Sequence, residues 1–150
     1  SWASAWRSHV IKVQPKSGRE ATETFLQGRG DVLLSYENEA LFAERNGDPV
    51  EHVTPPQTFK IENPAAVLTK SAGVKAATAF NEFLYTPEAQ RIIATYGNRV
   101  RDQAVAAEFG DQFPEVRLVT VEDVFGGWQK AQKTHFEDGG VFDAIYAPGN

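Results

Sequence analysis

The sequence predicts a mixed α/β fold that opens with a strand–helix–strand unit and ends in a helix-rich region. Two apolar, strand-like runs, VIKVQ at 10–14 and DVLLSY at 31–36, flank a capped helical segment. After residue 70, apolar residues recur at helical spacing. Strand, helix and strand within about thirty residues is typical of a βαβ unit, whose two strands are parallel and whose crossover is right-handed.

The helix of this unit is expected from about 19 to 28. Ser17 is a natural N-cap, because its hydroxyl can accept a hydrogen bond from an N–H of the first turn. Glu20, three residues later, completes a capping-box pattern. Gly28 and Gly30 are suited to end the helix. The nearly continuous apolar run that follows indicates a buried parallel strand.

The middle of the chain is expected to cross between two parts of the fold. Residues 37–46 read as a helix that stops at Gly47. The segment 50–70 contains three prolines, which favour short extended pieces over helix. We expect strands there near 50–53, 58–61 and 65–69.

The C-terminal region is expected to be mainly helical. The apolar spacing predicts helices over 74–85 and 87–96, and Pro87 stands in a favoured first-turn position. FGGW at 125–128 indicates a tight turn with Trp128 as an aromatic anchor. The remaining elements expected are a short helix at 2–8, a looser stretch at 98–110, a strand at 117–121, an interrupted helix at 123–136 and a short helix at 142–147.

The composition excludes several classes of function. The net charge is −5 and the basic residues are scattered, which argues against a nucleic-acid partner. No cysteine is present, so thiolate chemistry and disulfides are excluded. Apolar runs are too short to cross a bilayer, and no signal peptide pattern is present at the start. The chain also lacks methionine, which favours a processed or excised piece of a longer protein.

The residues offer little for catalysis. The Gly-x-Gly turn at 28–30 is too short for a dinucleotide fingerprint and follows its helix, so no cofactor is predicted. Glu37 and Glu39 could act as acid and base. A solvated first turn, favoured by the helix dipole, is the interpretation that we prefer for them. The isolated histidines form no zinc-binding pattern and no metal site is expected; they are His9, His52 and His135.

An anion site is a stronger candidate. The first N–H groups of a helix lack intrahelical partners, and Gly18 lets backbone approach a ligand closely. Tyr36 ends the following apolar run and could donate its hydroxyl or lay its ring on a ligand. Ligands of open α/β sheets lie at strand carboxyl ends, near helix N-termini. A purely structural cap and an anion site both remain open from the residues alone.

Three stretches resemble the periplasmic sulfate- and thiosulfate-binding proteins of ABC importers. They are SGREATETFLQGRGDVLLSYENEA at 17–40, FNEFLYTPEAQRII at 80–93 and FPEVRLVTVEDVFGGWQKAQKTHFEDGGVFDAIY at 113–146. The resemblance extends over nearly the whole chain but covers only the C-terminal half of a typical member.

The resemblance implies a type II periplasmic binding fold, with two lobes and the anion between them. Family members hold sulfate with neutral donors, chiefly backbone N–H groups at helix starts. Carried over by position, the helix-start donor is Gly18, and Ser17 and Arg19 border the same turn. The aromatic ligand falls on Tyr36, where close relatives have tryptophan, so sulfate and thiosulfate both remain open.

The resemblance also implies a location and partners. It predicts a periplasmic or extracytoplasmic protein that works with ABC permease subunits. On the family template, residues 1–36 finish the second lobe, 37–70 cross, and 71–150 form the helix-rich part of the first lobe. The other anion ligands belong to the missing N-terminal half, so we expect exposed sheet edges that this half or a second copy covers. The open alternatives are a non-binding scaffold fragment, a thiosulfate binder, or a small α/β enzyme that uses Glu37 and Glu39.

Overall fold

The computed structural model describes residues 13–146, which divide into two compact units. Unit 1 takes in the described residues up to Leu34, Pro55–Ile61 and those from Val116 onward. Unit 2 consists of Ser35–Thr54 and Glu62–Glu115. The expected division into lobes at residues 36 and 70 stays a prediction.

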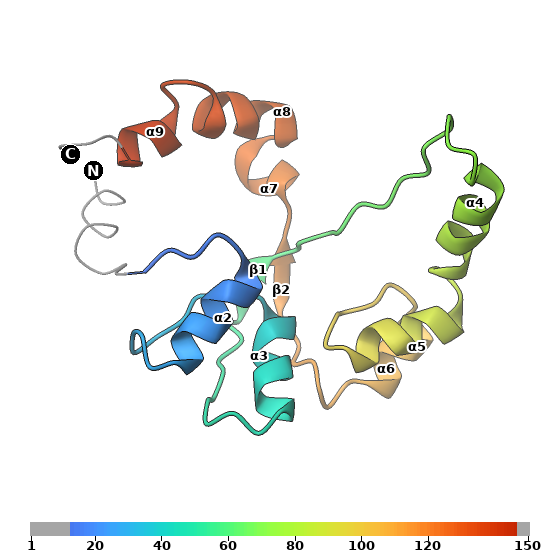
Figure 1. Ribbon diagram of the computed structural model, residues 1–150, viewed down its shortest axis with the longest axis horizontal. Coiled ribbons are helices and arrows are strands. Elements are labelled where there is room, and N and C mark those ends of the chain that lie inside the picture. The colour runs from blue at the N-terminus through green and yellow to red at the C-terminus, as the bar shows by residue number, and fades with distance from the viewer. Residues whose placement is uncertain (1–12, 147–150) are drawn as a thin grey trace. The chain divides into compact units, whose positions relative to one another are not determined.

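Unit 1 contains a short, two-stranded parallel sheet (Figure 1). The sheet consists of β1 (Gln57–Phe59) and β2 (Arg117–Val119), with Thr58 opposite Leu118. The Lys60 N–H extends the ladder by donating to the Val119 carbonyl at 2.9 Å. The predicted mixed α/β class is confirmed. The strands expected at 58–61 and 117–121 are observed as β1 and β2, which are three residues long each and pair in parallel; β1 begins one residue earlier than expected.

The buried strand predicted over 31–36 is wrong. Residues 31–36 are not in a ladder, and Val32 and Leu34 are 82% and 74% exposed. An extended apolar segment becomes a strand only when a neighbour pairs with its N–H and C=O groups. Within the described residues no such neighbour pairs with it, so the predicted βαβ unit has no second strand. Residues 13–14, the described end of the first strand expected at 10–14, are not in a strand either. The strands expected at 50–53 and 65–69 are absent for the same reason.

The helices follow the predicted order closely. The expected helices near 19–28, 37–46, 74–85, 87–96 and 142–147 are observed as α2 (Gly18–Leu26), α3 (Glu37–Arg45), α4 (Val74–Phe83), α5 (Pro87–Thr95) and α9 (Val141–Tyr146). The stretch expected to be loose contains a further helix, α6 (Gln103–Glu108). The expectations at 2–8, 10–12 and 147 lie outside the described residues.

The FGGW turn separates two helices of unit 1. Gly126, with φ of 73°, ends α7 (Val121–Phe125), and Gly127 precedes α8 (Trp128–Ala131). A π-helical turn, η1 (Gln132–Phe136), continues α8 directly. The predicted tight turn is confirmed, but Trp128 is 68% exposed, which does not fit the role of an anchor. Phe125 takes that role, because its ring stacks on Phe59 of β1 with 5.9 Å between centroids.

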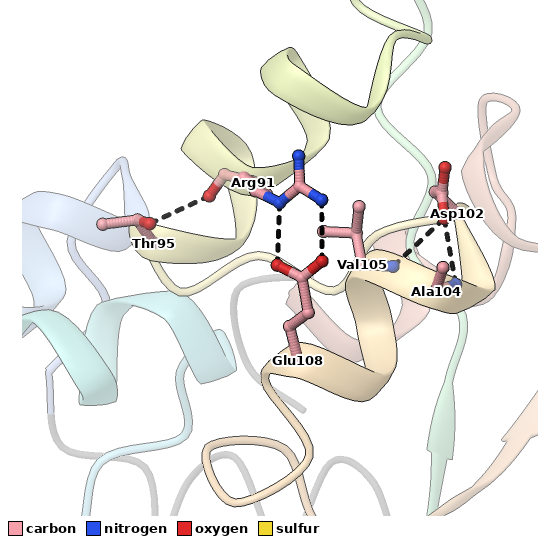
Figure 2. A network of polar contacts seen from close by, with 6 residues as sticks. All are labelled: Arg91, Thr95, Asp102, Ala104, Val105 and Glu108. Atoms are coloured by element: carbon pink, nitrogen blue, oxygen red, sulfur yellow. Dashed lines mark hydrogen bonds and ion pairs between the residues drawn. The ribbon is translucent and has the colours of Figure 1, made fainter.

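The packing of α5 against α6 organises part of unit 2 (Figure 2). Val105 of α6 and Ala94 of α5 are fully buried. At the surface of this pair, Arg91 donates to both carboxylate oxygens of Glu108, at 2.7 and 2.8 Å. These hydrogen bonds lower the pKa of Glu108 and raise that of Arg91. The ion pair therefore links the two helices while remaining in contact with solvent.

Candidate anion-binding site

The start of α2 is capped as the sequence predicts. Ser17 has extended backbone angles, φ −139° and ψ 160°, and its Oγ accepts a hydrogen bond from the Glu20 N–H at 3.2 Å. The Glu20 carboxylate accepts from the Lys16 N–H at 3.1 Å, one residue earlier than in a regular capping box. The Ser17 hydroxyl therefore serves the helix itself.

The backbone N–H of Gly18 is a donor that the Ser17 cap does not satisfy. Gly18 is the first residue of α2, and no described acceptor within 13–146 bonds to its N–H. Arg19 follows at the second helical position. Thr22, which is buried, donates its hydroxyl to the Gly18 carbonyl at 3.2 Å and so ties down the first turn. The backbone dipole of α2 favours a negative charge at this end.

Tyr36 lies at the start of a helix and not at the end of a strand, since 31–36 form no strand. It is the N-cap residue of α3, with φ −78° and ψ 148°, and its carbonyl accepts from the Glu39 and Ala40 N–H groups at 3.1 and 3.3 Å. Its side chain makes no capping hydrogen bond and is half-exposed. The phenol is thus held through its backbone and is open to a ligand.

The predicted anion residues fall in both units. The structure brings Ser17, Gly18 and Arg19 together on one turn of unit 1. Tyr36 belongs to unit 2. Each group has the chemistry of an anion donor in its own unit.

The two glutamates after Tyr36 are part of the packing of unit 2. Both oxygens of Glu37 receive hydrogen bonds from Arg99, at 2.7 and 2.9 Å, and Thr54 Oγ1 adds one at 3.2 Å. Glu39 is buried. Arg99 is the residue that sequence reasoning missed: it stands 62 positions from Glu37, and no local pattern connects the two.

Other kinds of site find no support over residues 13–146. No group of three or more possible metal ligands occurs there. No helix in this part of the chain has the length and apolar character needed to cross a bilayer.

The remaining clear pKa shifts belong to structural contacts: hydrogen bonding to Thr120 lowers the pKa of Asp123, and hydrogen bonding to Glu62 raises that of Arg101.

Comparison with known proteins identifies the family. Residues 3–99 match the model of the bacterial extracellular solute-binding proteins, and the chain belongs to this family. The family is one of binding proteins, not enzymes, so the hypothesis of catalysis by Glu37 and Glu39 is set aside.

Individual relatives are similar over most of this chain. The sulfate-binding protein of Salmonella typhimurium is 43% identical over 142 residues, which cover 90% of this chain and 43% of that protein. The thiosulfate-binding protein of Pseudomonas aeruginosa is 41% identical over 145 residues, covering 92% of this chain and 44% of that protein. Among solved structures, the sulfate-binding protein SubI from Mycobacterium tuberculosis H37Rv matches with a TM-score of 0.77 and 56% identity, over 84% of this chain and 44% of SubI. The chain thus spans less than half the length of these relatives.

Proposed function

We propose that this chain carries part of the sulfate site of an extracytoplasmic solute-binding protein that serves an ABC importer. The single observation that carries the proposal is the capped start of α2, where the Gly18 N–H remains as a donor beside a favourable helix dipole. The similarity to proteins named for sulfate binding supports the choice of ligand.

Gly18 and Tyr36 are the proposed ligand residues. The Gly18 N–H donates from the start of α2, and the Tyr36 hydroxyl donates from the start of α3. Both donors are neutral, and preformed neutral dipoles can replace water around an anion without a buried counter-charge. Ser17 and Arg19 border Gly18. In this proposal Ser17 caps α2, and Arg19 influences how the anion approaches the Gly18 N–H.

The proposed fold is part of a type II periplasmic binding protein, to which this chain contributes a portion of each lobe. A buried dianion needs more donors than Gly18 and Tyr36 can supply, since unmet charge in a protein interior is costly. The remaining donors are proposed to come from an N-terminal half of the same fold, and the ABC permease subunits receive the anion. A second copy of the chain is the alternative source of donors.

Sulfate is the first choice of ligand and thiosulfate the second. Relatives named for either anion match this chain to a similar extent. Tyr36 could favour one of them, because a phenol hydroxyl and an indole N–H differ in reach.

The test is calorimetric titration of the 150-residue chain with sulfate, thiosulfate and phosphate, using a pair of variants at one backbone donor. Gly18→Pro removes the N–H while keeping the helix, because proline is favoured at the first helical position. The extended Ser17 backbone already suits a following proline. Gly18→Ala keeps the N–H and is the matched control.

The proposal predicts saturable sulfate binding that Gly18→Pro and Tyr36→Phe weaken and Gly18→Ala leaves nearly intact. Losing one donor to a charged ligand is expected to cost about 1.5–3 kcal/mol, or roughly ten- to hundredfold in Kd. Absence of heat with all three anions would contradict binding by this chain and favour a scaffold fragment. Equal weakening by proline and alanine would contradict the assignment of the Gly18 N–H.

A further inference from the structure

Arg99 fastens the start of α3 to the rest of unit 2. Its Nε and Nη2 atoms donate to the two oxygens of Glu37, and Nη2 also donates to the Pro114 carbonyl at 2.8 Å. The guanidinium carbon lies 5.2 Å from the centre of the Phe113 ring. A planar guanidinium with a bidentate partner, a carbonyl and an aromatic ring has a defined orientation.

A neighbouring residue makes a second contact with the same turn. Gly97 has a φ of 85°, and a Cβ built there would lie 3.3 Å from the Asn38 Cα. The backbone at Gly97 therefore lies directly against the first turn of α3. Close backbone contact at Gly97 and the ion pair at Arg99 hold this turn in one position before any ligand binds.

The partner of Arg99 has an unfavourable charge for an anion site. Glu37 directly follows Tyr36 and is the first residue of α3. Its carboxylate suits the helix dipole, but it repels an anion that approaches Tyr36. If the carboxylate and a bound dianion were about 10 Å apart in water, the repulsion would weaken binding of the dianion roughly fourfold. The Arg99–Glu37 pair is neutral overall, so this repulsion is cancelled.

We propose that Arg99 is a positioning residue for the anion site: by pairing with Glu37 it cancels the negative charge beside Tyr36 and lets this end of the site receive a sulfate-like dianion. The inference rests on the proposed function for its ligand. Its effect on charge can also be measured without sulfate.

The binding test is a cycle of variants in the full 150-residue chain: Arg99→Gln, Glu37→Gln and the double variant. At low salt, Arg99→Gln is expected to raise the sulfate Kd about fourfold, because the Glu37 charge is left uncompensated. The double variant should return to the wild-type value, and Arg99→Lys should stay near it because the charge is kept. In about 1 M NaCl, where the Debye length is about 3 Å, the differences should vanish. A double variant as weak as Arg99→Gln would overturn the proposal.

The second test follows amide hydrogen exchange at Glu37 and Asn38 by NMR without sulfate. Hydroxide, itself an anion, catalyses this exchange near neutral pH. An uncompensated Glu37 carboxylate should repel it, so Arg99→Gln should slow exchange at low salt, and the double variant should restore the rate. If Arg99 only stabilised the structure, Arg99→Gln would have the opposite effect, because amide protons at a loosened helix start exchange faster.

These two tests separate the inference from the proposed function. If the wild-type chain binds no sulfate, the proposed function fails, yet the exchange rates still decide the role of Arg99. Slower exchange in Arg99→Gln, with recovery in the double variant, would support Arg99 as the group that neutralises Glu37. Unchanged or faster exchange would overturn it, whatever the sulfate titration shows.

Discussion

At the scale of single residues, glycines with a positive φ have the clearest consequences. Gly97 and Gly47 both have positive φ, 85° and 81°. They differ in their surroundings: a Cβ at Gly97 would contact Asn38 and Leu41, whereas a Cβ at Gly47 would meet nothing within 4 Å. The pair therefore separates the cost of the backbone conformation from the cost of a displaced neighbour.

Gly97→Ala is expected to lower the free energy of unfolding by about 2–3 kcal/mol, and Gly47→Ala by about 1 kcal/mol. Both variants pay for a left-handed alanine, and only Gly97→Ala pushes on the start of α3. Urea unfolding of the two variants measures the difference. Equal losses would show that the approach of Gly97 to α3 is not tight.

The Arg91–Glu108 pair predicts a pH dependence. Hydrogen bonding to Arg91 lowers the pKa of Glu108 in the folded chain. The resulting stability is present above the ordinary carboxyl range of about 4 and is lost as pH falls through the lowered value. Glu108→Gln should therefore flatten the acid side of a plot of urea midpoint against pH, measured at low salt because the pair is exposed. Parallel curves for wild type and variant would be inconsistent with this prediction.

At the scale of elements, side-chain caps decide where several helices begin. Ser17, Thr86, Asp102 and Thr120 each accept hydrogen bonds from the first turn of the helix that follows. Asp102 is the informative case, because α6 has only six residues and was expected to be loose. One of its carboxylate oxygens, Oδ1, accepts from Ala104 and Val105 N–H groups at 2.9 and 3.1 Å (Figure 2).

Asp102→Ala is expected to destabilise unit 2 by about 1 kcal/mol, since a cap and its two hydrogen bonds are lost. Asp102→Asn should cost much less, because asparagine caps as well as aspartate. Thermal unfolding followed by circular dichroism compares the variants. A large loss in Asp102→Asn would indicate that the charge of Asp102, and not its capping, matters.

At the scale of the whole molecule, the described chain buries few large apolar side chains. Among these residues, Val105 is the one large side chain that is fully buried; the other buried apolar residues are Ala43, Ala89, Ala94 and Ala131. Large exposed apolar residues are numerous, including Val32 and Leu34. A chain that spans less than half of its relatives' length has fewer neighbours with which to cover such surface.

The exposed run at 31–34 is expected to bind the dye ANS. Val32 and Leu34 are both largely exposed and stand only two positions apart in the chain. The double variant Val32→Ser/Leu34→Ser should lower ANS fluorescence with little change in helical circular dichroism. Val53→Ser, which removes one isolated exposed side chain, is the control and should have a smaller effect. Equal fluorescence in all three chains would argue against an apolar surface at 31–34.

The sequence by itself determined most of the helices and the start of the candidate site. Ser17, Pro87 and the Gly126–Gly127 turn act within a few residues of themselves, so their effects can be derived locally. Only the tertiary structure decided which apolar runs became strands, because a ladder needs a partner. Residues 57–59 pair with 117–119, whereas nothing in the described part of the chain pairs with 31–36. It also decided that Arg99 meets Glu37 across 62 positions, since such a contact depends on how the whole chain packs and not on any local pattern.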